Sequence, residues 1–375
     1  MEETKKKTNI TSYIIVALLF LIIGLGSAYF ILQRNPKAET KEITKKNVTI
    51  TDDGIAEAVD KIYDAVVVVS TYQNDKLYGT GTGFVYKTDG DNAYILTNNH
   101  VIEGGTKVNV TFTNGSIIET NIVGSDALSD IAVLSVDKKD IITVAEIGKS
   151  SDLRVGDTAF AVGAPLDSIY SWTVTRGIIS GKDRMVEVSL SSNNGDYIMK
   201  VLQTDAAINN GNSGGPLCNS NGEVIGVTSL KLSGQNTTAS ATIEGMGFAI
   251  PIEIATSYAE KIISGEKIVQ PFLGVQMLNV SDAYYYPQYY SNLTKNNITN
   301  GVIVVSVENN SPAGKAGLEA GDIITKINNE ETTTIAYLRY YLYNYEVGDS
   351  VTLTVMRNGK EKQFNVVLGT NKNTY

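Results

Sequence analysis

The sequence predicts a mostly β protein with two folded regions behind an apolar N-terminal segment. Short runs rich in Val, Ile and Thr follow one another between Gly, Asn and Asp residues. Many short strands without long helices between them favour a sandwich or barrel over a parallel α/β sheet. The chain has 375 residues, enough for two domains of ordinary size. The larger folded region is long enough for two barrels packed together.

Composition excludes several classes of site. The hydrophobic fraction of 42% and the charged fraction of 19% are those of an ordinary globular protein. A net charge of −9 argues against nucleic acid as a partner, because phosphate binding requires a basic surface. One cysteine, Cys218, and one histidine, His100, exclude an internal disulfide, a cysteine metal cluster and a multi-histidine metal site.

Residues 13–32 are predicted to form a transmembrane anchor. They carry no charged side chain and, as a helix, would span about 30 Å, the thickness of a bilayer core. Lys5, Lys6 and Lys7 precede them, which places residues 1–12 in the cytoplasm and the folded part on the outer face of the cell membrane. The alternative is a cleaved signal peptide, with Gly26 and Ala28 before the cut. The apolar run is longer than a usual signal peptide core, which favours a retained, single-pass anchor.

Residues 33–54 are polar and charged, and they predict a flexible linker. The first folded domain is expected over 55–265. Its predicted strands include 65–70, 174–180 and 186–190. Near its end, Ile254, Tyr258 and Ile262 recur at helical spacing, so we expect an amphipathic helix that closes the domain.

Three side chains in this domain suggest nucleophilic catalysis. His100 follows the strand-like run YILT, Asp130 precedes the apolar run IAVL, and Ser213 lies in the glycine loop of QTDAAINNGNSGGPL. A serine hydroxyl needs a neighbouring base, an imidazole can act as that base, and a carboxylate holds the imidazole in the required tautomer. The order His, Asp, Ser is that of chymotrypsin-type double barrels.

The glycine loop adds a second function to this site. Gly211 and Ser213 can direct backbone N–H groups at a developing oxyanion, an effect worth roughly 10²–10³ in rate per donor. A phosphate-binding loop is disfavoured, because no Gly-Lys-Ser/Thr follows the glycines. Asp126 is the nearest rival carboxylate, but Asp130 directly precedes the apolar strand and is therefore better held in place.

The segments TNNHVI, SDIAVL, TVTRGIIS, QTDAAINNGNSGGPL and GFAIP resemble the HtrA/Deg family of serine proteases. The resemblance implies two perpendicular β-barrels and an endoprotease of protein quality control and stress response, which acts on misfolded or damaged exported proteins. Carried over residue by residue, it implies His100 as base, Asp130 as its orienter and Ser213 as nucleophile. Gly211 and Ser213 would be the oxyanion donors. It also implies a homotrimer and neither a metal ion nor an organic cofactor.

Two departures from the family pattern concern the surroundings of the site. The family often has Gly-Asn-Pro where this chain has Gly163-Ala164-Pro165, close to the expected active site. The loop QNDKLYGTG after the first strand is short, which puts a large cage-like assembly in doubt.

Residues 271–370 resemble a PDZ domain of the type found in HtrA proteases. They include PFLGVQM, a short helix expected around 312–316, and a longer one whose buried face holds Ile335, Leu338, Leu342 and Tyr345. Such a domain would bind peptide C-termini by adding them as a strand to a sheet edge. Phe272-Leu273-Gly274-Val275 matches the family's carboxylate-binding loop. The Asn- and Tyr-rich insertion 279–300 is expected to be a surface loop, and we assign it no role.

A second function from a different class remains open. The chain could be a peptide-binding chaperone or stress sensor with little proteolytic activity. The intact His-Asp-Ser set favours the protease, whereas a sequence cannot show whether the oxyanion loop is correctly formed.

Overall fold

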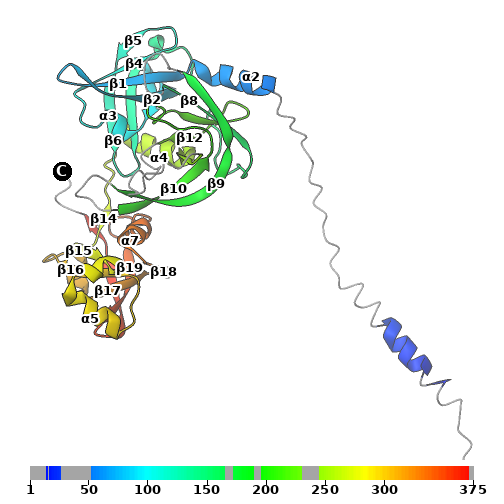
Figure 1. Cartoon of the computed structure of the whole chain (residues 1–375), viewed down its shortest axis with the longest axis vertical. Coiled ribbons are helices and arrows are strands. Elements are labelled where there is room, and N and C mark those ends of the chain that lie inside the picture. Colours follow the sequence, from blue (N-terminus) through cyan, green and yellow to red (C-terminus); the bar gives the residue numbers. More distant parts are fainter. Residues whose placement is uncertain are drawn as a thin grey trace, which may run out of the picture. The chain divides into compact units, whose positions relative to one another are not determined.

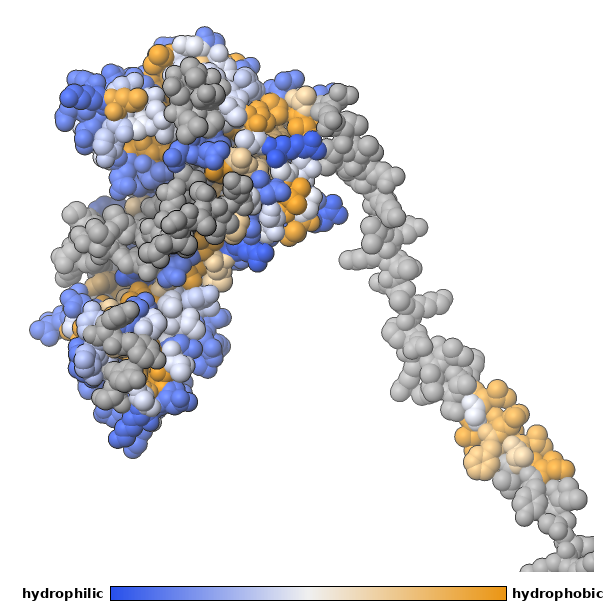
Figure 2. Space-filling view, viewed as in Figure 1, coloured by the Kyte–Doolittle hydropathy of each residue, from blue (hydrophilic) through white to orange (hydrophobic). Residues whose placement is uncertain are grey.

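The computed structural model describes residues 14–15, 17–26, 52–164, 172–189, 196–229 and 245–370. The first two of these ranges are helical, and their large apolar side chains are exposed, as the colouring of Figure 2 makes visible. Among the described residues, no helix is long and apolar enough to cross a membrane. The predicted cytoplasmic end 1–12, both ends of the predicted anchor 13–32 and most of the predicted linker 33–54 lie outside the described residues.

The first domain begins with a helix that the sequence analysis did not predict. Helix α2 (Asp52–Tyr63) buries Ile55, Ala58 and Ile62, which are three and four residues apart and therefore share one face. The predicted linker thus extends into the first turn of a helix. Its polar flanking residues concealed a short apolar stripe.

The first half of this domain is a seven-stranded antiparallel sheet in the order β5-β4-β1-β2-β3-β7-β6 (Figure 1). Its strands are β1 (Val66–Gln73), β2 (Lys76–Asp89), β3 (Asn92–Thr97), β4 (Lys107–Thr111), β5 (Ile117–Glu119), β6 (Asn121–Asp126) and β7 (Ile131–Asp137). Helix α3 (Asn99–Ile102) follows β3, and the 3₁₀ turn η1 (Lys138–Asp140) follows β7. The two end strands, β5 and β6, are joined through Thr120 alone, so the sheet wraps round on itself.

The second half is a closed barrel in the order β10-β13-β12-β11-β8-β9. Its strands are β8 (Thr158–Gly163), β9 (Thr173–Ser189), β10 (Asp196–Thr204), β11 (Pro216–Asn219), β12 (Val224–Thr228) and β13 (Gly247–Pro251). The expected strand 174–180 and residues 186–189 of the expected strand 186–190 form one continuous strand, β9, and residue 190 lies outside the described residues. The predicted closing helix is present as α4 (Ile252–Ile263).

Alternation along β8 shows how the two halves pack. Ala159 and Ala161 face the interior of the barrel, where small side chains leave room for the Leu and Ile residues of neighbouring strands. Phe160 and Val162 face the opposite way, into a core shared with Phe84 of the first sheet. The site described below lies on loops and strand ends contributed by both halves.

The second domain is a six-stranded sheet with helices. Its main strands are β15 (Val275–Asn279), β16 (Val302–Val307), β17 (Ile323–Ile327), β19 (Ser350–Arg357) and β20 (Lys360–Val367) in that order, with β18 (Glu330–Glu331) beside β17. A separate pair joins β14 (Pro271–Phe272) to β21 (Gly369–Thr370). Helices α6 (Pro312–Ala316) and α7 (Ile335–Leu342) correspond to the two expected helices. Helix α7 ends before Tyr345, the last residue of its predicted buried face.

The insertion 279–300 is folded, unlike the surface loop that we expected. It forms the 3₁₀ turn η4 (Val280–Tyr285) and helix α5 (Pro287–Lys295). Val280, Ala283 and Leu293 are buried in a small cluster with Ile303 and Ile323 of the sheet. The Asn- and Tyr-rich composition of the segment hid these few apolar anchors.

Candidate active site

His100 lies in the single turn of helix α3, directly after β3 ends. Three hydrogen bonds join this turn to Asp130. The N–H of Asn99 donates to the carbonyl oxygen of Asp130 (3.1 Å), and so does the side-chain amide of Asn98 (2.9 Å). The N–H of His100 itself donates to Oδ1 of Asp130 (3.1 Å). The position of the imidazole is therefore set by the residue that its ring also contacts.

The ring of His100 pairs with the carboxylate of Asp130. Nδ1 of His100 lies 2.9 Å from Oδ2 and 3.0 Å from Oδ1 of Asp130. The Asp130 side chain is fully buried, whereas that of His100 is 27% exposed. An ionised carboxylate can only accept hydrogen bonds, so Nδ1 carries the hydrogen and Nε2 keeps its lone pair. This is the tautomer that a general base requires.

Asp130 is held in an unusual backbone conformation. Its φ is +56°, in the left-handed region that aspartate tolerates better than most residues. The turn before it is closed by Asp126, whose Oδ2 accepts the N–H of Ser129 (2.7 Å). The structure thus brings Asp130, and not the rival Asp126, to His100. Asp126 serves the turn that precedes the pair.

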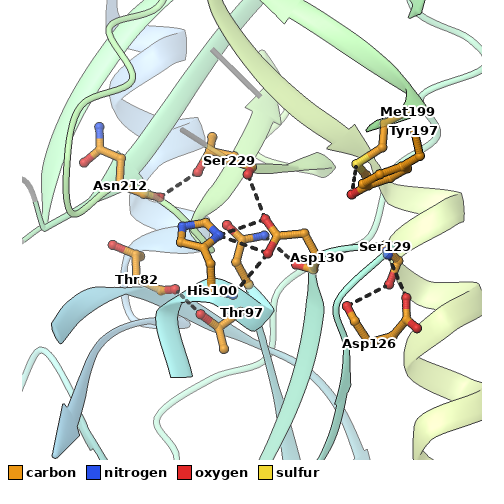
Figure 3. A network of polar contacts seen from close by, with 12 residues as sticks. Thr82, Thr97, His100, Asp126, Ser129, Asp130, Tyr197, Met199, Asn212 and Ser229 are labelled. Atoms are coloured by element: carbon orange, nitrogen blue, oxygen red, sulfur yellow. Dashed lines mark hydrogen bonds and ion pairs between the residues drawn. The ribbon is translucent and has the colours of Figure 1, made fainter. Parts of the chain in front are cut away.

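Ser229 is a further partner of Asp130, which the sequence analysis missed. Its hydroxyl donates to Oδ2 of Asp130 (2.9 Å), and the residue is fully buried just beyond the end of β12. Figure 3 shows Ser229 and His100 meeting the carboxylate from two sides. The hydroxyl of Ser229 therefore helps to hold the carboxylate in its orientation toward the imidazole. A polar residue after a buried strand was the only signal in the sequence.

The loop that carries Ser213 is a sequence of tight turns. The N–H of Asn212 donates to the carbonyl oxygen of Asn209 (3.0 Å), and Gly211 has a φ of +98°. A positive φ at the third position identifies a type II turn, which glycine adopts without strain. This turn uses the N–H of Asn212, and the N–H groups on either side of it, those of Gly211 and Ser213, are the candidate oxyanion donors that the sequence predicts.

Gly214 brings this loop against the segment that leads to His100. A Cβ on Gly214 would lie only 2.9 Å from the N of Asn98, in addition to its positive φ of +84°. The N–H of Gly214 donates to the carbonyl oxygen of Thr228 (2.8 Å), which adjoins Ser229. The glycine therefore allows the loop of Ser213, the turn of His100 and the end of β12 to approach one another. Ser213 itself is 5% exposed.

Gly163 and Ala164, where the chain departs from the family pattern, border the same loop. A Cβ on Gly163 would approach Cα of Asn212 to 2.9 Å, so the glycine is required for close packing. Ala164 is buried, and Pro165 lies outside the described residues.

Neither Cys218 as an alternative nucleophile nor a metal site is favoured by the described residues. Burial raises the pKa of the Cys218 thiol, which disfavours the reactive thiolate. In the ranges that the structure describes, no three His, Cys, Asp or Glu side chains gather as a metal site would need.

The second domain contains a different kind of candidate site around Phe272-Leu273-Gly274-Val275. The carbonyl oxygens of Leu273 and Gly274 accept the N–H groups of Ala313 and Glu308, both at 2.9 Å. Gly274 has a φ of +78° and packs against the side chain of Ser311. The loop leads into β15, which ends the strand order of its sheet. The side-chain oxygen of Asn279, at the end of β15, accepts the N–H of Ile335 at the start of α7 (2.7 Å).

Two stretches of the chain match known domain families. Residues 81–227 match the Trypsin-like peptidase domain, and residues 271–368 match the PDZ domain. The first match contains His100, Asp130 and Ser213, and the second contains the loop 272–275.

Two serine proteases are similar to this chain over most of its length. "Serine protease Do-like HtrB" of Bacillus subtilis (strain 168) is 39% identical over 372 residues, covering 93% of this chain and 79% of the relative. "Serine protease Do-like HtrA" of Lactococcus lactis subsp. cremoris is 34% identical over 393 residues, covering 96% of both chains.

Solved structures give the same result. The serine endoprotease from Yersinia pestis superposes with a TM-score of 0.62 at 30% identity, covering 85% of this chain and 98% of that one. The HtrA-type protease AlgW with a decapeptide gives a TM-score of 0.63 at 27% identity, with 84% and 98% covered.

Proposed function

Because the chain belongs to the HtrA family of serine proteases, we propose that it is a membrane-anchored endopeptidase that cleaves misfolded or damaged exported proteins. That the chain is a serine endopeptidase with a PDZ domain follows from its relatives and its two domain matches. The observation that carries the proposed mechanism is the buried pairing of Asp130 with Nδ1 of His100 beside the Ser213 loop.

In this mechanism Nε2 of His100 takes the proton of Ser213 as Oγ attacks the scissile carbonyl carbon. The same proton then passes to the leaving amine, and water repeats the sequence to release the acyl group. Asp130 stabilises the imidazolium that forms. The hydroxyl of Ser229 and the backbone N–H of His100 donate hydrogen bonds to the Asp130 carboxylate. The N–H groups of Gly211 and Ser213 receive the oxyanion.

The choice of unfolded substrates has a direct test. An endopeptidase needs an extended segment in its active site, and a misfolded protein offers many such segments. We expect Ser213-dependent cleavage of a protein in its unfolded form and little cleavage of its folded form. Binding of the unfolded protein without Ser213-dependent cleavage would instead favour the chaperone or sensor.

We further propose that the PDZ domain binds peptide C-termini beside β15. Among the described residues β15 pairs only with β16, so its other edge is available for strand addition. The loop 272–275 precedes this edge, and its backbone N–H groups would receive the terminal carboxylate.

This site predicts a strong dependence on a free C-terminus. Amidating the C-terminus of a bound peptide should weaken its affinity about 10-fold or more, because charge-assisted hydrogen bonds are lost. Fluorescence polarisation with the full chain carrying Ser213→Ala measures both peptides without cleavage. Equal affinities for the acid and the amide would contradict carboxylate recognition.

Membrane anchoring through 13–32 is likewise our proposal, with residues 1–12 cytoplasmic and the protease on the outer face. It is supported by the uncharged segment, by the lysines before it and by the exposed apolar side chains of the described helix. We expect the native protein to stay in the membrane after alkaline extraction, with its N-terminus intact. Soluble protein that begins near residue 29 would instead identify a cleaved signal. The mass of the solubilised particle tests the homotrimer, which rests on family resemblance.

A further inference from the structure

Thr82 is a fully buried residue of β2 whose polar groups all face the active site loops. Its hydroxyl donates to the carbonyl oxygen of Gly211 (2.6 Å), and its backbone N–H donates to that of Ser213 (2.9 Å). Its hydroxyl also accepts the N–H of Ala164 (3.0 Å), and its carbonyl oxygen accepts the hydroxyl of Thr97 (2.7 Å). One residue therefore holds both ends of the segment 211–213.

This segment needs an external restraint. Gly211 is free of the Cβ that limits other residues, so its peptide groups can rotate at little cost. The peptide group between Gly211 and Asn212 lies between the two candidate oxyanion donors, and Thr82 binds its oxygen. A change in the orientation of that peptide group alters the direction of one donor relative to the other. Oxyanion stabilisation depends on donors that are fixed before the charge develops.

We propose that Thr82 is a positioning residue for the oxyanion hole, acting through its hydroxyl on Gly211 and through its N–H on Ser213. The inference rests on the proposed roles of those two N–H groups. It also links the loop at Ala164 to the nucleophile loop, because one hydroxyl receives a hydrogen bond from the first and gives one to the second. Figure 3 shows the Thr82–Thr97 contact on the His100 side of this network.

The test compares Thr82→Val with Thr82→Ser in the full chain. Valine keeps the shape and the backbone N–H but lacks the hydroxyl, and we expect kcat for a peptide substrate to fall about 10- to 100-fold with KM little changed. Serine keeps the hydroxyl and should restore kcat to near the wild-type value. If the valine variant does not fold, Thr82→Ala removes the hydroxyl without a branched replacement and is measured in its place.

Thr120→Val is the matched control. Thr120, which links β5 to β6, is also buried and donates its hydroxyl to a backbone carbonyl oxygen, that of Val108 (3.0 Å). Its removal should lower stability in the same way but leave kcat unchanged. Equal losses of kcat in both variants would show that Thr82 matters only for stability, and would overturn the inference.

A second measurement separates positioning from a structural effect. A peptide boronic acid forms a tetrahedral adduct that places an oxygen in the hole, so its affinity should fall in Thr82→Val by the same factor as kcat/KM. The pH profile, which reports His100, should not move. If the wild-type enzyme shows Ser213-dependent turnover but Thr82→Val binds the boronate as tightly as the wild type, the positioning role of Thr82 is wrong and the proposed function still stands. A wild-type chain without such turnover removes the proposed function and this inference together.

Discussion

Replacing Ser213 with alanine is expected to abolish peptide hydrolysis, with a loss in kcat on the order of 10⁶-fold. The substitution removes the proposed nucleophilic oxygen, whereas the turns around it are held by backbone hydrogen bonds, those of Asn212 N–H to Asn209 and of Gly214 N–H to Thr228. Cleavage of an unfolded protein, followed by gel analysis and by the rate of a fluorogenic peptide, measures the loss. A fluorophosphonate probe should label the wild-type chain and not the variant.

The folded state of the Ser213→Ala variant is the necessary control. Its thermal unfolding should match that of the wild type within a few degrees, because the change removes one oxygen atom and keeps the backbone of the loop. Residual cleavage at the wild-type rate in a correctly folded Ser213→Ala chain would mean that another group is the nucleophile. Absence of both label and cleavage in the wild type would contradict the proposed mechanism itself.

The sequence was most informative where chemistry and local pattern coincide. His100 and Asp130 could be selected because each stands at the boundary of an apolar strand, and Ser213 because three glycines surround it. The helix at 252–263 could be predicted from the local spacing of Ile254, Tyr258 and Ile262. These features depend on residues close together in the chain.

Features that depend on distant residues could not be predicted in this way. Ser229 contacts Asp130 across 99 positions of sequence, and Thr82 contacts Gly211 across 129. Each is one Ser or Thr among many in the chain, and nothing in its neighbouring sequence indicates its partner. The partners come together only when the two halves of the domain pack against each other. The sequence pattern therefore indicated the reacting groups but not the residues that hold them.

The long strand β9 shows a different limit. The residues Gly181, Lys182 and Asp183 are typical of a turn between two strands. In the structure, however, β9 pairs with β10 on both sides of Lys182 and Asp183. Val201 lies opposite Arg184 and Gln203 lies opposite Gly181, so β9 has one more residue than β10 between these two pairs. Asp183, within this stretch of β9, has a φ of +51°. Such an extra residue is a β-bulge, which interrupts alternation without ending the strand. A pattern with period two cannot distinguish that bulge from a turn.

Asp130→Asn is expected to reduce kcat by about 10⁴-fold while leaving the fold intact. The amide is nearly the same size as the carboxylate, and with its oxygen in the Oδ1 position it still accepts the N–H of His100. Its NH₂ group then takes the Oδ2 position, where the hydroxyl of Ser229 can turn to accept from it. However, its NH₂ group favours the His100 tautomer with the lone pair on Nδ1 and the hydrogen on Nε2. That tautomer cannot take the proton of Ser213, so the loss should appear in kcat and should be partly relieved at high pH, where hydroxide can substitute for the base.

Asp126→Asn is the matched control for this substitution. It makes the same chemical change four residues earlier, and the amide oxygen can still accept the N–H of Ser129. We expect turnover close to that of the wild type, because Asp126 does not contact the His100 ring in the described structure. Steady-state rates of both variants on one fluorogenic peptide decide between the two carboxylates. Loss of activity in Asp126→Asn with retention in Asp130→Asn would mean that the rival aspartate orients the base, and that the Nδ1–Oδ2 contact of 2.9 Å is only structural.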